Sequence, residues 1–360
     1  AAQPAKPAAE PAKPAAPAPQ PAKPAAQAPK PAAQPAAPAK PASGEAKRIL
    51  IGSTQSSSSQ YPYWVAVGKV INDNVPTVQA TVVETGATVE NINRGQRGEF
   101  DVMLITTDAA LQAYKGLDRW KDKPFTELRW LWLQRRTAVA IVVREDSGVK
   151  KLEDLNGKDF NPGIRGSATE KEVKDALEAL GIKPKWYTAG GPDAVQAIKD
   201  KRIVGYGKTM AGVDAIDASI LEIMVTTPIR VLGFTEDQGK KVQQAHPYYP
   251  FVSIPAGVFK DAEWNKQPVF TLGLAIGGGA TTRLPEDMAY AIVKALDQDQ
   301  MPSGKKVQAT AQKAIEADFG KATAEGGVIS EPPLHAGAIK WYKERGLKIP
   351  DALVPPEVKR

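Results

Sequence analysis

The stretch IGSTQSSSSQYPYWVAVGKVIND, Ile51 to Asp73, predicts how the folded part of this chain begins. An apolar strand over Arg48–Ile51 leads into a loop rich in serine, and an amphipathic helix over Tyr63–Asn72 follows. Similar steps from strand to helix recur further along the chain, which indicates an α/β architecture with mainly parallel sheets. In such folds ligands bind beyond the carboxyl ends of the strands, where this loop would lie.

Further steps of this kind are expected over residues 78–98, 100–116, 138–181 and 184–203. The 317 residues after position 43 are long for one hydrophobic core and suit two lobes. We expect the first lobe over 44–142 and 266–360 and the second over 143–265. The apolar run Val269–Ala280 would carry the chain back, with its glycines 277–279 turning before a helix that starts near Pro285.

Residues 1–43 are a repetitive tract of Ala, Pro, Lys and Gln, which predicts an extended, disordered spacer. It would act either as a reach-extender at a wall or membrane or as a passive tail. The net charge is +7, of which five lysines and one glutamate in this tract contribute +4, so the rest carries only +3. We expect no nucleic-acid partner, because the one cluster of aromatics and arginines, Arg129–Arg136, suits a half-buried segment with snorkelling cations.

The chain has no cysteine and only two histidines, His246 and His335, which excludes thiol chemistry and a His-rich metal site. We expect no metal and no cofactor, and no apolar run is long enough to span a bilayer. The sequence begins without methionine, as an exported protein does after its signal peptide is removed, and as a cloned fragment also does.

Four loops lead into expected helix N-termini, whose unpaired amides suit carboxylate or phosphate groups. They are 53–60, 84–88, 106–108 and 163–169. In the last loop Ser167 and Glu170 match a capping box, which satisfies helix amides without a ligand, although capping and ligand contact are compatible. Arg165 is either an ordinary solvated arginine or a ligand-binding residue whose planar guanidinium binds a carboxylate.

Several enzyme signatures are missing from the sequence. It contains neither a P-loop nor a dinucleotide-binding fingerprint, and it lacks the G-x-S-x-G elbow of serine hydrolases. A catalytic serine also needs a base within reach. His246 lies in the proline-bracketed segment HPYYPF, and His335 stands at the start of an expected helix, where it would cap an element. We therefore expect no catalytic residue and a protein that is not an enzyme.

The order of several motifs resembles the TAXI-type substrate-binding proteins of TRAP transporters. The matching stretches are ILIGSTQSSSSQYPYWVAVGKVI, ETGATVENINRGQRGEFDVMLITTD, VVREDSGVKKLEDLNGK, GIRGSATEKEV, PFVSIPAGVF, RLPEDMAYAIVKAL and PPLHAGAIKWYKERG. Together they cover essentially all of residues 46–346. The resemblance implies a two-lobed, type II-like periplasmic-binding-protein fold with the ligand in the cleft between the lobes, which would close on the ligand by a hinge near residues 140–145. It also implies a periplasmic receptor that captures a small organic anion (a dicarboxylate, a keto acid or an acidic amino acid) and delivers it to the membrane subunits of a TRAP permease.

Carried onto this sequence, the resemblance and the loop positions predict a set of ligand-binding residues. These are Ser53, Ser56, Ser57, Ser58, Ser59, Tyr61, Thr85, Gly86, Asn91, Thr107, Asp108, Arg165, Ser167, Ala168, Thr169, Tyr206 and Lys208. Two departures from the family pattern matter. The first loop has lost its usual glycines, so it is expected to follow a different path and to serve a different ligand. Around residues 202–212 the usual pattern is replaced, which brings Lys208 near the pocket, unless it is a surface lysine.

Two other functions remain open from the sequence. The proline-rich spacer suits a periplasmic ligand sensor that signals to a membrane partner without transport, since a free receptor needs no tether. A serine esterase would use one hydroxyl of the first loop. A neighbouring permease gene would favour the receptor, a neighbouring sensor kinase would favour the sensor, and labelling by serine-directed phosphonates would favour the esterase.

Overall fold

The structure, a computed structural model, describes residues 46–325 and 331–358. The spacer predicted over residues 1–43 lies outside the described residues. The contacts divide the chain into two units, Ala1–Ala42 and Ser43–Arg360, and the fold below is that of the second unit.

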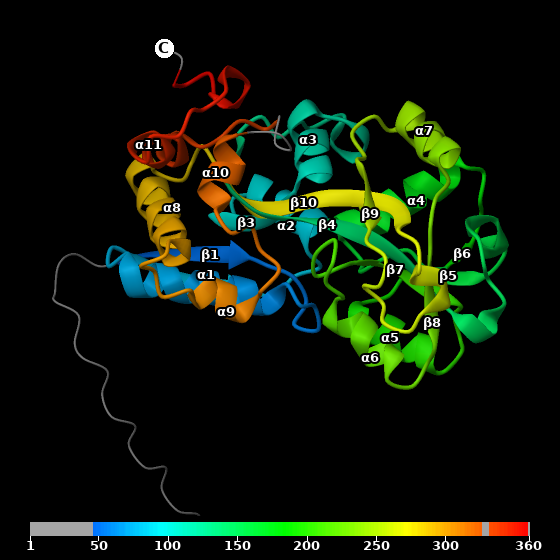
Figure 1. The fold of residues 1–360 in the computed structure, drawn as a ribbon. Coiled ribbons are helices and arrows are strands. Elements are labelled where there is room, and N and C mark those ends of the chain that lie inside the picture. Colours follow the sequence, from blue (N-terminus) through cyan, green and yellow to red (C-terminus); the bar gives the residue numbers. More distant parts are fainter. Residues whose placement is uncertain (1–45, 326–330, 359–360) are drawn as a thin grey trace, which may run out of the picture. The chain divides into compact units, whose positions relative to one another are not determined.

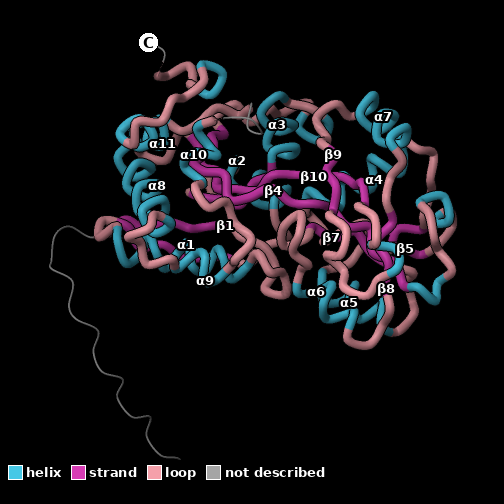
Figure 2. The backbone as a smooth tube through the Cα atoms, viewed as in Figure 1, coloured by secondary structure: helices cyan, strands magenta, loops and turns pink. Residues whose placement is uncertain are grey.

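One mixed sheet of ten strands forms the centre of this unit (Figures 1 and 2). Its order is β2-β1-β3-β10-β4-β7-β5-β6, with β8 also paired to β4 and β9 to β10. The strands are β1 Lys47–Gly52, β2 Val78–Val83, β3 Val102–Thr106, β4 Leu128–Arg144, β5 Asp159–Asn161, β6 Lys185–Trp186, β7 Gly205–Thr209, β8 Ile229–Leu232, β9 Phe251–Ile254 and β10 Val269–Thr281.

The α-helices gather into two groups around this sheet. They are α1 Tyr61–Asn74, α2 Thr88–Gln96, α3 Thr107–Lys115, α4 Ala168–Ala179, α5 Gly191–Lys199, α6 Ala218–Met224, α7 Glu236–Ala245, α8 Glu286–Gln300, α9 Val307–Ala311, α10 Phe319–Ala324 and α11 Ala336–Glu344. In Figure 1, α1–α3 and α8–α11 surround β1–β3, and α4–α7 surround β5–β8. We call these groups the first and the second lobe.

The two long strands β4 and β10 belong to both lobes. Strand β4 pairs with β10 up to Ala138 and with β7 from Val139 onward, so it changes partner as it passes from one lobe to the other. Its side chains alternate between two hydrophobic clusters: Val139 and Ile141 pack in one, and Ala140 and Val142 in the other. Both faces of β4 are therefore covered, and the α/β, two-lobed architecture expected from the sequence is confirmed.

The expectation of mainly parallel sheets is wrong. Pairs β1–β2, β1–β3, β5–β6 and β5–β7 are parallel, but β10 is antiparallel to β3, β4 and β9, and β4 is antiparallel to β7 and β8. The strand-to-helix steps give parallel pairs within each lobe. The crossings between lobes are made by single long strands, and a strand that crosses back runs against its neighbours.

The glycines at 277–279 do not form a turn, contrary to the sequence-based expectation. They lie in the middle of β10, between β3 and β4. A Cβ added at Gly278 would lie 2.4 Å from the indole ring of Trp132, and one at Gly279 would lie 2.4 Å from Ile105. Glycine is needed here because bulky side chains of the neighbouring strands occupy the space. The expected helix does begin next to Pro285, which is the N-cap residue of α8.

The arginines of Arg129–Arg136 do not all reach solvent, as half-buried snorkelling would require. All residues of this run except Arg136 are buried in β4. Arg129 forms an ion pair with Glu357, and Arg135 is 2% exposed.

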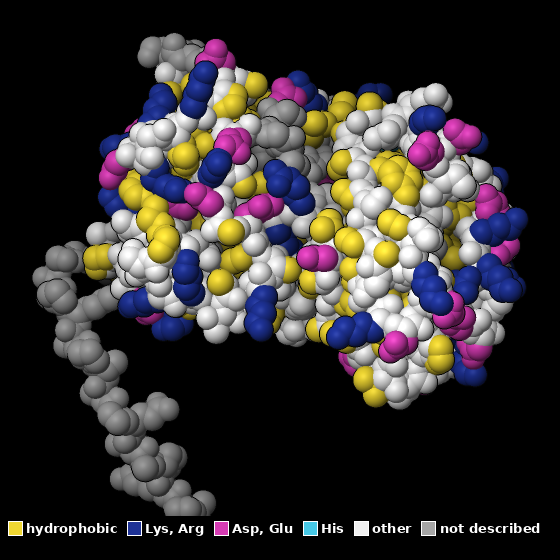
Figure 3. All heavy atoms as spheres, viewed as in Figure 1, with side chains coloured by type: hydrophobic (Ala, Val, Ile, Leu, Met, Phe, Trp, Pro, Cys, Tyr) yellow, Lys and Arg dark blue, Asp and Glu magenta, His cyan; other side chains and the backbone are white. Residues whose placement is uncertain are grey.

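None of the described helices combines the length and apolarity that a membrane span would need. On the face shown in Figure 3, basic and acidic side chains alternate over both lobes.

Candidate functional site

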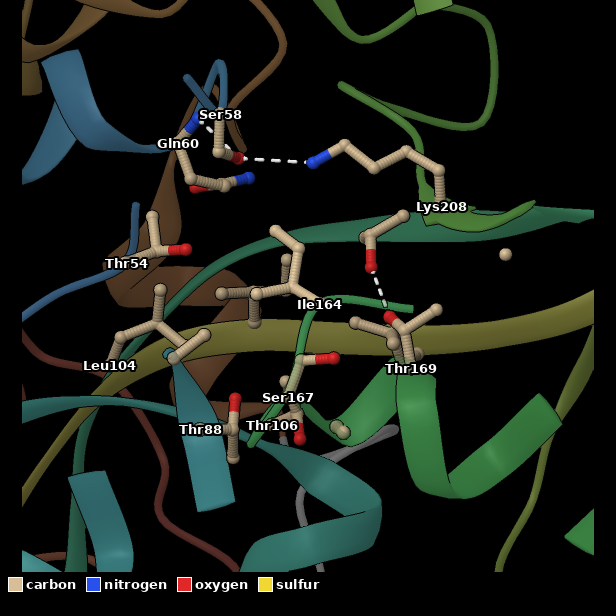
Figure 4. Close-up of a pocket in the computed structure, with 16 residues that line it drawn as sticks. Thr54, Ser58, Gln60, Thr88, Leu104, Thr106, Ile164, Ser167, Thr169 and Lys208 are labelled. Carbon is tan, nitrogen blue, oxygen red and sulfur yellow. Dashed lines mark hydrogen bonds between the residues drawn. The ribbon is translucent and has the colours of Figure 1, made fainter. Parts of the chain in front are cut away.

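A small cavity of about 50 Å³ lies between the two lobes (Figure 4). The first lobe contributes the loop after β1, the start of α2 and the end of β3, while the second contributes the loop before α4, its first turn, and β7. The shared strand β10 completes the wall. The lining residues are Thr54, Ser58, Gln60, Ala87, Thr88, Leu104, Thr106, Ile164, Ser167, Ala168, Thr169, Gly207, Lys208, Thr209, Leu274 and Ile276.

Hydroxyl groups dominate the polar part of this wall because it is built from strand ends and helix starts. Thr54 follows β1, Thr106 is the last residue of β3, and Thr88 is the first residue of α2. Such positions leave backbone amides and small polar side chains at one edge of a sheet. Leu104, Leu274 and Ile276 supply the apolar part from the strands themselves.

Helix α4 begins at the cavity with the Ser167 cap expected from its sequence, but the reciprocal half of the capping box is not formed, because the Ser167 amide donates to the carbonyl oxygen of Ile164 instead of to Glu170. Ser167 is its N-cap residue, and the Ser167 hydroxyl accepts a hydrogen bond of 3.1 Å from the Glu170 amide. The Glu170 carboxylate in turn accepts from the amide of Gly166 at 2.9 Å. Ser167 also lines the cavity, so capping and a place on the wall are combined. Within the first turn of α4, Thr169 shares a hydrogen bond of 2.5 Å with Thr209.

Helix α2 meets the opposite lobe at its N-terminus. The amides of Val89 and Glu90 donate to the carbonyl oxygen of Gly166 at 2.9 and 3.2 Å. Two of the amides that a ligand anion could use are therefore satisfied by the second lobe. The partial positive charge of α2 stabilises contact between the lobes in this conformation.

Lys208 is buried on β7, with 5% of its surface exposed, so it is not a surface lysine. Its ammonium lies 3.4 Å from the Ser58 hydroxyl and 3.4 Å from a carboxylate oxygen of Asp217 (Figure 4 shows the Ser58 contact). Asp217 is fully buried and accepts from the Ser59 hydroxyl at 2.5 Å and the Ser219 hydroxyl at 2.7 Å. Although burial works to raise it, the pKa of Asp217 is lowered by Lys208, Ser59 and Ser219.

A second buried cation lies beside this pair. Arg135 donates from Nη2 to the carbonyl oxygen of Met210 at 2.7 Å, and its Nη1 has no hydrogen-bond partner among the described residues. Burial lowers the pKa of Arg135 to about 9, and Asp217 opposes this shift, so the guanidinium stays charged at neutral pH. In the alternative orientation of the Gln60 side-chain amide, its oxygen and nitrogen exchange places. The oxygen then accepts a hydrogen bond of 2.6 Å from Nε of Arg135. The two cations, Arg135 and Lys208, and the one carboxylate, Asp217, therefore leave this buried group with a net charge of +1.

Of the predicted ligand-binding residues, five line the cavity. They are Ser58, Ser167, Ala168, Thr169 and Lys208.

Several of the others hold the first lobe together. Asn91 donates to the carbonyl oxygens of Ser53 and Leu104 at 2.8 and 3.1 Å, and Thr85 donates to that of Ser53 at 3.0 Å. The Ser53 hydroxyl donates to Val83, and the Thr107 hydroxyl accepts from the Ala275 amide.

The remaining predicted residues lie at the edges of the site. Ser56 donates to Glu84, and Tyr61 is the first residue of α1. Tyr206 shares a hydrogen bond with Ser219, and Arg165 donates to the carbonyl oxygen of Thr188 on the surface. The last four predicted residues do not line the cavity: Ser57, Ser59, Gly86 and Asp108. Three of them contact the second lobe. Ser57 lies close to Gly191, Ser59 donates to Asp217, and Gly86 lies close to Arg165.

The serine loop joins the lobes more than it faces the cavity. Beside the Ser59–Asp217 and Ser58–Lys208 contacts, the Gln55 side chain accepts from the Gly191 amide at 2.7 Å. The described non-glycine residues with positive φ are Ala87, Asp118, Lys201, Asp261 and Lys306, so residues 53–60 contain none. The loop does not use the left-handed region that favours glycine, so its serines are accommodated without backbone strain.

The remaining lining residues were not expected from the sequence. Four of them belong to the predicted loops. A prediction that took every residue of each loop would have included Thr54, Gln60, Thr88 and Thr106. Thr209, Leu274 and Ile276 lie within strands, where no local signal marks a ligand site. Arg135 and Asp217 are also absent from the prediction, because their positions depend on contacts between distant parts of the chain.

Comparison with known proteins supports the same fold. The model of a family described as the NMT1-like family matches residues 51–346. A solved structure described as the periplasmic binding protein BugD has a TM-score of 0.50 and 12% identity, and the match covers 84% of this chain and 99% of that one. A structure described as a periplasmic transporter has a TM-score of 0.50 and 13% identity, with 84% and 98% covered.

Proposed function

The chain belongs to the NMT1-like family, and we propose that it is a solute-binding receptor that encloses a small organic anion between its lobes. The observation that carries this proposal is the pair of buried cations, Lys208 and Arg135, next to one buried carboxylate, Asp217. A buried excess of positive charge is costly unless an anion compensates it. The cavity beside Lys208 is where that anion would lie.

The wall suits a compact ligand with a carboxylate and a short carbon skeleton. Hydroxyls of Ser58, Thr88 and Thr169 would donate to the carboxylate oxygens, and Leu104 and Ile276 would contact the apolar part. A cavity of about 50 Å³ holds only a few water-sized groups, so a larger dicarboxylate requires the lobes to open further.

We propose that the lobes close on this solute by bending where β4 and β10 change partners. Strand β4 changes at Ala138 and Val139, and β10 changes from pairing with β9 to pairing with β4 between Leu272 and Gly273. These positions lie near the boundaries expected at 142 and 266. Contacts made only in the closed form, such as Gln55 with Gly191, would shift the population toward closure.

The finer assignment rests on the motif resemblance. We propose a receptor of the TAXI type, located in the periplasm, that delivers its solute to a TRAP permease. We further propose that it binds without catalysis, because neither histidine lines the cavity. His335 caps α11 and His246 lies at the end of α7, against Tyr248. Lys208, the basic side chain next to Ser58, is held by Asp217 as an ion pair rather than poised as a base.

A thermal-shift screen with Lys208→Met tests the proposal. The wild-type protein should be stabilised by some members of a panel of monocarboxylates, dicarboxylates, keto acids and acidic amino acids, and not by neutral sugars. An anion at 100 times its dissociation constant adds about 2.7 kcal/mol to the free energy of unfolding. Lys208→Met should lose this gain.

The matched control is Lys185→Met, an exposed lysine in the second lobe, which should keep the full response. Stabilisation by neutral sugars alone, or an unchanged anion response in Lys208→Met, would contradict an anion site beside Lys208.

A further inference from the structure

Two carboxyl groups are buried beside the cavity, one from each lobe. Asp108 is the second residue of α3 and is 2% exposed, and Glu172 on α4 is fully buried. Asp108 follows the cavity residue Thr106 by two positions, and Glu172 follows the cavity residue Thr169 by about one helical turn. The charge of Asp108 acts on Glu172, so the two carboxyls lie near each other across the boundary between the lobes, close in sequence to the cavity residues Thr106 and Thr169.

Glu172 lacks donors altogether, and Asp108 lacks a donor at one of its two carboxyl oxygens. Both oxygens of Glu172, Oδ1 of Asp108 and Oε1 of the neighbouring Gln112 have no hydrogen-bond partner among the described residues. All of these atoms accept hydrogen bonds when the carboxyls are ionised. A buried carboxylate without a donor or counter-ion is costly, and a proton is the simplest remedy. In the closed conformation at least one proton is expected on the pair.

The charged groups around the pair do not replace that proton. Lys171 on α4 is engaged by Asp175 at 2.6 Å and by Asp118 of the first lobe. Asp175 also accepts from the Tyr249 hydroxyl at 2.6 Å, and His246 lies 3.9 Å from it.

The pKa values agree with this arrangement. Burial, followed by the charges of Asp108 and Asp175, raises the pKa of Glu172 well above its ordinary range, and burial raises the pKa of Asp108. Burial and Asp175 raise the pKa of Tyr248 to about 12, so this phenol stays neutral.

We propose that Asp108 and Glu172 form a proton-binding site shared by the two lobes, which is filled when the lobes close and emptied when they open. Opening would separate α3 from α4 and expose both carboxyls to water, where their pKa values return to about 4. Protonation then favours closure, and closure weakens as the pH rises through the raised pKa of Glu172. A receptor built this way takes up a proton when it captures its solute and gives it back on release.

A disulfide that locks the lobes allows this site to be tested without a solute. The chain has no cysteine, so Ser57→Cys with Gly191→Cys introduces a single pair. A Cβ added at Gly191 would lie 3.0 Å from the Ser57 hydroxyl oxygen, across the lobe boundary, which is close enough for a disulfide. The oxidised protein holds the closed form, and the reduced protein is free to open.

Infrared spectroscopy of the locked protein, labelled with ¹³C-glutamate, detects whether a glutamate carboxyl group is protonated. We expect a protonated glutamate carbonyl band that persists above the pH range in which an exposed glutamate titrates and that Glu172→Gln abolishes. Glu178→Gln, an exposed glutamate on the same helix, is the matched control and should leave the band unchanged. If Glu172→Gln does not fold, Asp108→Asn replaces it. Removing that neighbouring charge should lower the pH at which the band disappears.

The effect of pH on lobe closure is measured in the unlocked protein. Spin labels at Lys69→Cys in the first lobe and Lys240→Cys in the second report the distance between the lobes, and the two side chains are 62% and 68% exposed. As the pH rises from about 4 toward the raised pKa of Glu172, the ratio of closed to open molecules should fall by up to tenfold per pH unit, and Glu172→Gln should remove this dependence. A locked protein without the glutamate band, or a lobe separation independent of pH, would overturn the proposal. Either result leaves the anion proposal intact, because no solute is present.

Discussion

At the scale of single residues, Asp217 decides the electrostatics of the site. It is fully buried, lies 3.4 Å from the Lys208 ammonium, and opposes the loss of charge on Arg135. It also receives both the amide and the hydroxyl of Ser59 from the first lobe, at 3.2 and 2.5 Å. One carboxylate therefore neutralises a buried cation and holds the lobes together.

Replacing Asp217 by Asn should destabilise the protein by about 3–5 kcal/mol, the usual cost of removing one partner of a buried ion pair. Urea unfolding at neutral pH measures this loss. Adding Lys208→Met should recover part of it, because no ammonium is then left without its partner. If the double variant loses as much stability as the two single variants together, Asp217 does not act through Lys208.

The sequence predicted residues whose role is local better than residues whose role depends on distant contacts. The S-x-x-E spacing identified Ser167 as a cap, and the start of a helix identified His335. Arg135 and Asp217 carry the charge of the site but lie 82 positions apart, and neither has a local pattern that marks it. Only the fold brings them near one another.

At the scale of elements, β10 shows why a strand was mistaken for a strand followed by a turn. Three successive glycines are typical of a turn when only neighbours in sequence are considered. Here the reason for glycine lies on β3 and β4, whose Ile105 and Trp132 fill the space above the backbone. The helices that were expected, which depend on periodicity within each segment, lie close to their predicted positions, whereas α6, α7, α9 and α10 were not predicted.

Gly278→Ala tests this explanation. Its Cβ would lie 2.4 Å from the six-membered ring of Trp132, which is fully buried and cannot move without disturbing the hydrogen bond of 2.9 Å to the Tyr63 hydroxyl. We expect a loss of about 1–3 kcal/mol in urea unfolding, as for other overpacked cores. Combined with Trp132→Leu, the alanine should cost much less than it does alone. Strictly additive losses would mean that Trp132 is not the obstacle.

At the scale of the whole molecule, the two lobes contact each other closely, and in the proposed function this arrangement is the closed form. Contacts across the lobe boundary come from the serine loop, from the N-terminus of α2 and from the Lys171–Asp118 ion pair. The sequence and its resemblance to a receptor family predicted the two lobes. They did not predict that the serine loop would serve closure, because its hydroxyls meet partners such as Asp217, 158 positions away.

The Ser57→Cys, Gly191→Cys lock tests whether this closed form is the one that retains solute. Oxidation should leave no free thiol and should raise the free energy of unfolding by about 2–4 kcal/mol, since the bridge closes a long loop. Anions that stabilise the reduced protein should have no effect when added after oxidation, because the cavity is then shut. Oxidation after the anion is added should instead trap it through gel filtration, and reduction should release it. Free exchange of solute in the oxidised protein would show that access to the cavity does not require the lobes to part.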